Sequence, residues 1–374
     1  MITKLPRLAI KIIFIIITCL VLVLFLPALL SFWVSPQEFW VIGFLTLIFP
    51  YTATILALLC IFWFISKPKF GWFILIVFLL GYKHYCAIFS FTSIKDFMLN
   101  KQTKDIRIIS WNIQSFNGIS KTKEAKKNSK NDILNCINKY KPNIVCLQEF
   151  NTSNLSADAD NLSTFKKYYP YYYFSEDYKR KKGSYISGCI IFSTYPIIKT
   201  GKTKYPFAES LIYADIKINS DTIRVYTSHL QSFKFKKEDY DELDNISQHN
   251  EASKTASKNL FNKMKLAFKH RAEQANIVNS VTSADNKPSI ICGDFNDVPA
   301  SYTYNTIKGN RQDAFLNNIF GIGKTFTSLA PTLRIDYILP DNYFKINQFD
   351  LVDENLSDHL MLVTDVMLHN NKSH

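Results

Sequence analysis

The first hundred residues consist of long apolar stretches with few polar interruptions. Hydrophobic side chains run from Ile12 to Val34, from Phe39 to Ile65 and from Phe70 to about Phe91. A helix of about 20 residues crosses the hydrocarbon of a bilayer, and the first two stretches exceed this length without a charge. Lys83 and His84 interrupt the third stretch. We therefore expect three membrane spans, with two as the alternative if the third lies at the interface.

A cleaved signal peptide is the alternative for the first apolar stretch. A second apolar stretch follows at once, however, and the small-residue pattern of a cleavage site is poor. We therefore expect an all-α transmembrane region over residues 1–100 and a separate domain over residues 101–374.

Beyond residue 100 the apolar runs are shorter and read as strands and helices of a folded domain. Apolar positions at helical spacing predict helices at 131–141 and from about residue 252 onward. Alternating or continuous short apolar runs predict strands. The expected strands are 106–112, 143–149, 187–193, 211–218, 222–229, 290–294, 332–339 and 361–367.

Charge separates the two parts further. Residues 1–100 hold seven of the 44 Lys and Arg and two of the 31 Asp and Glu, which leaves residues 101–374 with 37 basic and 29 acidic residues, a surplus of eight. Such a surplus favours anionic partners such as nucleic acid, phospholipid headgroups or phosphorylated small molecules. A solvated lysine-rich surface without a partner is the alternative.

The seven cysteines indicate neither a zinc site nor a disulfide framework. None has Cys-x-x-Cys spacing, and most lie in apolar runs, as small buried side chains do. The compartment of the protein is therefore not revealed by cysteine usage. The cysteines are Cys19, Cys60, Cys86, Cys136, Cys146, Cys189 and Cys292.

Polar side chains occur where several predicted strands end. Asn112, Glu149 and His229 close three of them, and the run 290–294 ends in Gly-Asp-Phe-Asn. Asp294 and Asn296 lie two residues apart and therefore share a face. A carboxylate can accept a proton from water or ligate a hard cation, and a neutral amide can bind a phosphate oxygen without repelling it. Taken singly, each has an ordinary alternative as a turn, capping or core-edge residue.

Further candidates follow along the chain. Asp336 lies in the expected strand 332–339, where Arg334 shares its face, and Asp358 and His359 precede the last strand. Arg271 and Gln274 lie on the long helix, and their ordinary alternative is an exposed helix surface.

Six of these elements occur in an order that resembles one family. Trp-Asn, Gln-Glu, Ser-His-Leu, Gly-Asp-Phe-Asn, Arg-Ile-Asp-Tyr and Ser-Asp-His together resemble the endonuclease/exonuclease/phosphatase superfamily with the deoxyribonuclease-I-like fold, over about residues 104–370. The resemblance implies an α/β (α+β) domain, a four-layered α/β sandwich of two packed mixed β-sheets flanked by helices. It implies nothing about residues 1–100.

The resemblance also implies roles for the candidate residues. Asn112 and Glu149 would hold a divalent metal, Mg²⁺ or alternatively Mn²⁺. Asp294 would position or deprotonate the attacking water, and His229 and His359 would stabilise charge on the phosphate or the leaving group. The resemblance implies supporting roles for five further residues. Asp336 would form a hydrogen bond with His359, and Asp358 would stabilise the turn. The substrate would be bound by Asn296, Arg271 and Gln274.

The substrate stays open at this stage, because one fold can serve many phosphoesters. A nuclease-like phosphodiesterase is the leading interpretation, and a sphingomyelinase-like lipid enzyme or an inositol-phosphate or small-molecule phosphatase is the alternative. The tyrosine-rich, basic segment 168–185 could stack bases or contact headgroups. A non-catalytic module for anionic ligands is a remote alternative. No obligate protein partner is expected.

Flanking charges predict the orientation in the membrane. Lys4, Arg7 and Lys11 precede or open the first stretch, and Lys67 and Lys69 follow the second. The positive-inside bias places these segments in the cytoplasm, so that three spans put residues 101–374 outside it. We thus expect an integral protein of the inner or plasma membrane with an extracytoplasmic catalytic domain.

Overall fold

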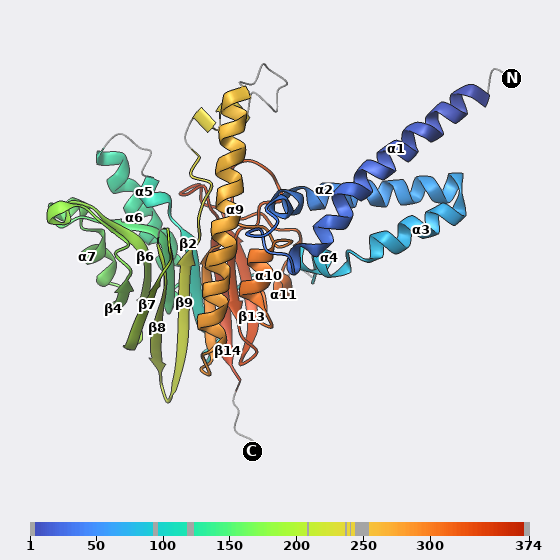
Figure 1. Ribbon diagram of the computed structural model, residues 1–374. Coiled ribbons are helices and arrows are strands. Elements are labelled where there is room, and N and C mark those ends of the chain that lie inside the picture. The colour runs from blue at the N-terminus through green and yellow to red at the C-terminus, as the bar shows by residue number, and fades with distance from the viewer. Residues whose placement is uncertain are drawn as a thin grey trace. The chain divides into compact units, whose positions relative to one another are not determined.

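The computed structural model describes residues 4–92, 96–117, 123–207, 209–235, 238–239, 241–243 and 254–369. The chain forms two compact units, and Figure 1 labels many of their helices and strands. Unit 1 comprises residues 1–88, 233–272 and 298–306; unit 2 comprises residues 89–232, 273–297 and 307–374. A functional division at residue 100 stays a prediction.

Unit 1 contains the apolar helices. The 3-10 helix η1 (Leu29–Phe32) connects α1 (Lys4–Ala28) toward α2 (Val41–Ser66). Trp63 Nε1 donates to Thr18 Oγ1 over 2.9 Å, which satisfies the buried indole between two apolar helices. The segments Ala9–Phe32 and Val41–Ser66 are each long and apolar enough to cross a membrane.

The third apolar stretch is not one unbroken helix. α3 (Pro68–Leu79) and α4 (Tyr82–Ile88) are bent by 55° and pass the length and composition test for a span only together. The break falls at Gly81, where an added Cβ would lie 2.5 Å from the Tyr85 hydroxyl. The expectation of a stretch reaching Phe91 is corrected, because Phe91 belongs to a strand.

Later parts of the chain complete unit 1. Much of α9 (Lys254–Ser283) belongs to it, and so does most of α10 (Tyr302–Lys308). The rings of Phe44 and Phe261 stack at 4.8 Å, and the Ser31 hydroxyl donates to the Ala300 carbonyl over 2.6 Å. The connection between α1 and α2 is therefore packed against residues from the last third of the sequence.

Unit 2 contains two sheets that share an apolar core. The five-stranded sheet has the order β12-β10-β9-β8-β7, and the larger sheet has the order β13-β14-β2-β3-β6-β4, with β5 beside β6. Within the described residues, only β9–β10 and β2–β3 pair in parallel. Ile108 and Ile191 of one sheet meet Ile216 and Ile290 of the other in this core. The strands are β2 (Ile106–Asn112), β3 (Ile144–Thr152), β4 (Tyr171–Phe174), β5 (Tyr178–Lys179), β6 (Ile186–Ser193), β7 (Ile197–Lys204), β8 (Ser210–Ile218), β9 (Asp221–His229), β10 (Ser289–Asp294), β12 (Asp336–Pro340), β13 (Phe344–Val352) and β14 (Met361–Leu368).

Helices cover the outer face of the larger sheet. Ile137 of α6 (Lys123–Lys139) and Phe165 of α7 (Asn161–Lys166) pack against Val145 in a second apolar core. The predicted class, packed mixed sheets flanked by helices, is confirmed. The remaining elements of this unit are α5 (Gln114–Asn117), α11 (Ala314–Asn318), the 3-10 helices η2 (Ala157–Ala159) and η3 (Lys181–Gly183), and the short strands β1 (Ser90–Phe91) and β11 (Phe320–Gly321).

Several boundaries differ from the sequence prediction. The helix expected at 131–141 begins earlier, at Lys123, and β4, β7 and β13 were not predicted. The strand expected at 332–339 begins only at Asp336. Arg334 therefore does not share a strand face with Asp336, and instead its Nη1 lies 2.6 Å from Asp313 Oδ2 in a buried pair.

A buried ion pair ties β2 to β14, and its loss should destabilise unit 2. Arg107 and Asp365 are fully buried and joined by two hydrogen bonds of 2.7 and 2.8 Å. We expect Asp365→Asn to lower the free energy of unfolding by about 3–5 kcal/mol, because it leaves a buried guanidinium without its counter-ion. Denaturant unfolding of the full chain in detergent measures this. Glu354→Gln, which removes an exposed pair with Lys139, is the control and should change little.

Gly293 permits the close approach of β9 and β10. Its φ is +148°, and an added Cβ would lie 2.0 Å from the Ser228 carbonyl oxygen. We expect Gly293→Ala to destabilise the protein by about 3 kcal/mol, since the two strands must separate. Gly309→Ala is the control, because Gly309 also has a positive φ, +49°, but a Cβ there meets nothing within 4 Å, so that only backbone strain is added. Equal melting temperatures for the two variants would contradict this account.

Candidate active site

The register of the five-stranded sheet brings three polar residues side by side. Asp294, the last residue of β10, pairs with His229 of β9 on one side and with Asp336 of β12 on the other. Asn112 ends β2 in the facing sheet, and its amide Nδ2 lies 3.0 Å from Asp294 Oδ2. The polar strand ends predicted from the sequence thus gather at one place in unit 2.

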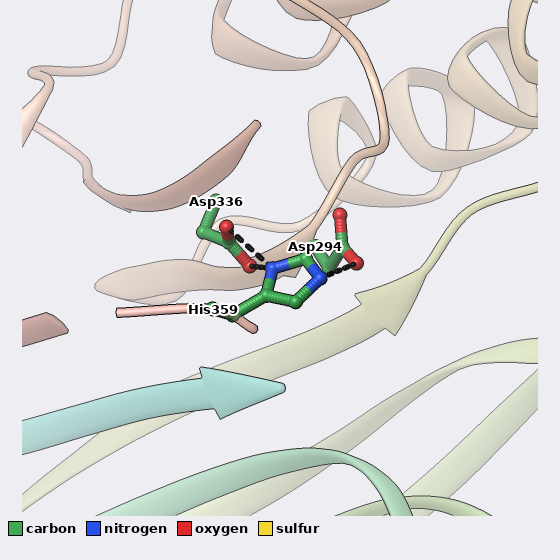
Figure 2. A group of neighbouring side chains, drawn as sticks. All are labelled: Asp294, Asp336 and His359. Atoms are coloured by element: carbon green, nitrogen blue, oxygen red, sulfur yellow. Dashed lines mark hydrogen bonds and ion pairs between the residues drawn. The ribbon is translucent and has the colours of Figure 1, made fainter. Parts of the chain in front are cut away.

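Asp336 fixes the orientation of His359. As Figure 2 shows, His359 Nδ1 faces Asp336, whose Oδ2 lies 2.9 Å away, and His359 Nε2 points toward Asp294, whose Oδ2 is 3.7 Å away. All three side chains are buried. Trp111 Nε1 donates to the His359 carbonyl over 2.8 Å, which holds the backbone as well. Asp358 lies farther off, with its Oδ1 4.0 Å from Nε2.

The second histidine has its own carboxylate partner. His229 Nδ1 lies 2.9 Å from Glu209 Oε2, and His229 Nε2 lies 3.5 Å from Asp294 Oδ2. The sequence reasoning missed Glu209. The available signal was the pair of neighbouring strands predicted at 211–218 and 222–229. In the hairpin that these strands form, Ile212 lies opposite Thr227, which places residue 210 opposite His229. Glu209 directly precedes that position, at a φ of +64°.

The surrounding carboxylates keep both imidazoles protonated. Burial alone would lower the pKa of His359, but Asp336 and Asp294 raise it to about 10. Burial likewise opposes the charge on His229, yet Glu209 and Asp294 raise its pKa to about 10. Burial and the neighbouring Asp336 raise the pKa of Asp294. At neutral pH the site therefore presents two cationic donors beside a carboxylate of increased basicity.

Glu149 is delivered to the site by an irregularity in β3. The pairing of β3 with β6 shifts register between Leu147 and Phe150, and Glu149 has a φ of +55°. An inserted residue re-aims a side chain, and a non-glycine residue in this region of φ is strained. The carboxylate receives long hydrogen bonds, 3.3 Å from Asn112 Nδ2 and 3.4 Å from the Ser115 hydroxyl.

Asn112 and Glu149 fit a hard divalent cation. The Asn112 amide group lies between the carboxylates of Glu149 and Asp294, and a half-turn of this amide would replace its Nδ2 by Oδ1, at the loss of the 3.0 Å hydrogen bond that Oδ1 accepts from the Gln114 amide. The resulting donors are all oxygens, as Mg²⁺ prefers. Asp294, Asp336 and His359 also place one ligand atom each within 4.8 Å of one another. That cluster fits a cation less well, because His359 Nδ1 is already bonded to Asp336.

The predicted substrate-binding residues occupy different places. Asn296 follows Asp294 in a tight turn, and its Nδ2 donates to the Leu230 carbonyl over 3.0 Å. Gln274 is buried and accepts a hydrogen bond from the Gln231 amide, two residues after His229. Through these bonds Asn296 and Gln274 hold the backbone that follows His229.

Arg271 belongs to unit 1, where it is fully buried and its guanidinium lies over the rings of Phe233 and Phe268, 4.6 and 4.9 Å from their centroids. Substrate binding by Arg271, Gln274 or Asn296 stays a prediction.

Comparisons with known proteins bear on the family of this chain. The model of the endonuclease/exonuclease/phosphatase family matches residues 109–359, and a model described as a domain of unknown function matches residues 11–88. No curated protein matches significantly.

Among solved structures, an endonuclease/exonuclease/phosphatase from Beutenbergia cavernae DSM 12333 has a TM-score of 0.50 at 18% identity, over 71% of this chain and 72% of that one. The human nocturnin catalytic domain with a bound sulfate anion has a TM-score of 0.49 at 18% identity, over 72% and 95%. The mannosyl-6-phosphatase of Bacteroides thetaiotaomicron VPI-5482 has a TM-score of 0.48 at 17% identity, over 70% and 100%.

Likeness at this identity concerns the fold alone. The family model, in contrast, spans most of unit 2, including the strand ends that carry the candidate site residues. The chain therefore belongs to the endonuclease/exonuclease/phosphatase family, and it is a metal-dependent hydrolase of phosphoester bonds.

Proposed function

We propose that this protein is a membrane-anchored, divalent-metal-dependent phosphodiesterase. The observation that carries the proposal is the position of Asp294, whose carboxylate faces the protonated imidazoles of His229 and His359 and the amide of Asn112. This arrangement combines a proton acceptor for water with cationic donors for the phosphate that the water attacks.

The side chains have separable roles in this proposal. Asp294 orients the attacking water and accepts its proton, helped by the raised pKa of its carboxyl group. His359, held by Asp336, and His229, held by Glu209, donate hydrogen bonds to phosphate oxygens, where negative charge grows in the transition state. Their rings are oriented before substrate arrives.

Glu149 and Asn112 would hold the metal. A bound divalent cation stabilises negative charge on phosphoryl and leaving-group oxygens without any proton transfer. The strained backbone at Glu149 supports this role, because strain persists where function requires a fixed side-chain direction.

A nuclease-like activity on phosphodiesters is favoured by the basic, aromatic segment 168–185, in which residues 178–182 are exposed. There the Arg180 guanidinium lies 5.9 Å from the Tyr178 ring and 5.4 Å from the Tyr185 ring. Such stacked side chains bind nucleic acid bases with little sequence preference. A phospholipid headgroup is the second candidate, favoured by the membrane anchor. A purely binding role explains neither the two His–carboxylate pairs nor the strain at Glu149.

Catalysis is tested by removing the metal ligand and the histidine. We expect Glu149→Gln and His359→Asn each to lower kcat on a generic phosphodiester by a factor on the order of 10² to 10³. Glu354→Gln, on the exposed surface, is the control and should retain activity. A chelator should abolish activity, and Mg²⁺ or Mn²⁺ should restore it. A panel of nucleic acid, sphingomyelin and inositol phosphates identifies the substrate. Full activity in the Glu149 variant would sink the proposal.

Contacts within unit 1 support the proposed orientation in the membrane. Ser31 and Phe44, at the two ends of the connection between α1 and α2, contact Ala300 and Phe261. With α1 and α2 both crossing the membrane, these contacts favour the same side for Phe261 and Ala300 as for that connection. With a cytoplasmic amino terminus this is the outer side, which supports three crossings and an extracytoplasmic catalytic domain.

A reporter tests this orientation directly. An alkaline phosphatase fused after Lys101 should be active, because that enzyme folds only outside the cytoplasm, whereas a fusion within the 67–69 connection should be inactive. An inactive fusion after Lys101 would show that α3 and α4 do not cross the membrane and that the domain is cytoplasmic.

A further inference from the structure

A small aromatic patch stands apart from the catalytic site in unit 2. The strands β1 and β11 pair antiparallel, with Phe91 directly opposite Phe320. The ring of Phe89 lies 4.7 Å from that of Phe91 and 5.2 Å from that of Phe320. Together with Ile322, two residues beyond Phe320, these side chains form what we call the aromatic patch.

The direction of the aromatic patch is fixed by the strand that carries it. Alternate residues of a strand point to opposite faces, so Phe89 and Phe91 share one face and Ser90 takes the other. Ser90 is buried, and its hydroxyl donates to the Leu316 carbonyl over 2.9 Å; the Thr92 hydroxyl donates to the same carbonyl over 2.8 Å. These bonds hold the inner face in place and keep the phenyl rings directed outward.

Phe89 is half-buried, but the other side chains of the aromatic patch are exposed. Phe91 is 73% exposed, Phe320 55% and Ile322 36%. A single exposed apolar side chain is ordinary, but contiguous apolar side chains on a fixed backbone indicate a surface that another apolar phase covers.

The connection of the aromatic patch to the apolar helices indicates what covers this surface. The helix α4 ends at Ile88, one residue before Phe89. Because an extended chain spans at most about 3.6 Å per residue, Phe91 lies within about 11 Å of Ile88. The strand pairing holds Phe320 beside Phe91. The aromatic patch therefore lies where the chain leaves the last apolar helix.

We propose that the aromatic patch inserts into the lipid bilayer, so that the catalytic unit touches the membrane through its own surface as well as through its helices. Aromatic and aliphatic side chains that lie in the headgroup region bind membranes in this way. The proposal rests on the membrane anchoring proposed above.

Contact with the bilayer would also act on the support of the catalytic pair. The strand β11 ends at Gly321, and four residues later the chain reaches Thr325, whose Oγ1 accepts a hydrogen bond from the Asp336 amide over 3.1 Å. The Thr325 carbonyl accepts another from the Leu360 amide, next to His359, over 2.7 Å. A segment anchored in the bilayer thus continues directly into the support of Asp336 and His359.

The test is photocrosslinking of the full chain in native membranes. p-Benzoyl-phenylalanine is placed singly at Phe91, at Phe320, at Leu58 on the exposed surface of α2, and at Tyr343, an exposed aromatic residue that follows β12. Lipid adducts are then measured by mass spectrometry. We expect adducts at Phe91 and Phe320 at a yield similar to that at Leu58 and several-fold above that at Tyr343.

Each of the other crosslinking outcomes would refute a different part of the proposal. Adducts at Leu58 without adducts at Phe91 and Phe320 would refute bilayer contact by the aromatic patch and leave the anchoring intact. The absence of adducts at Leu58 would refute the anchoring itself. Protein adducts in place of lipid at Phe320 would identify a protein partner and refute the proposal.

A second measurement tests the same contact if a variant that carries p-benzoyl-phenylalanine does not accumulate. Phe320→Trp is compared with Tyr343→Trp for quenching by brominated lipids, each as the difference from the unsubstituted protein. We expect stronger quenching at position 320. Equal quenching at the two positions would refute contact of the aromatic patch with the bilayer.

Discussion

Two buried histidines supply the positive charge that allows several carboxylates to share one end of the five-stranded sheet. His359 is paired with Asp336 and His229 with Glu209, and Asp294 faces both rings. Buried carboxylates without such partners would be costly or would become protonated. Because both histidine pKa values are raised, the stabilisation is complete below the ordinary pKa of histidine and is lost as pH rises toward about 10. The same histidine–carboxylate pairs therefore stabilise the fold and supply the charged groups of the proposed active site.

Much of this site could be predicted because strand ends are visible in the sequence. Asn112, His229 and Asp294 each end an apolar run, and the structure places all three at strand ends. Periodicity predicts where a strand ends, but the register between strands decides what lies beside it. Glu209 was missed for that reason, since it approaches His229 only through the pairing of β8 with β9.

Other features depend on tertiary structure that local patterns do not specify. Arg334 reads as part of an alternating strand, yet its pair with the distant Asp313 lies before β12 begins. The third apolar stretch reads as one helix, yet it breaks near Gly81, where close packing against Tyr85 leaves no room for a Cβ. The helical spacing of α9 likewise gave no sign that Phe261 would pack on Phe44.

The composition of unit 1 has a consequence for how the protein is made. Its apolar helices are synthesised before the rest of unit 1, because their packing partners come from residues 233–272 and 298–306. Contacts between such distant segments form late, since the later segment must first be synthesised and closing the long intervening loop costs conformational entropy. About two hundred residues are therefore synthesised between the apolar helices and their last packing partners, and in the proposed membrane-anchored state lipid would cover the unpaired helix surfaces during that interval.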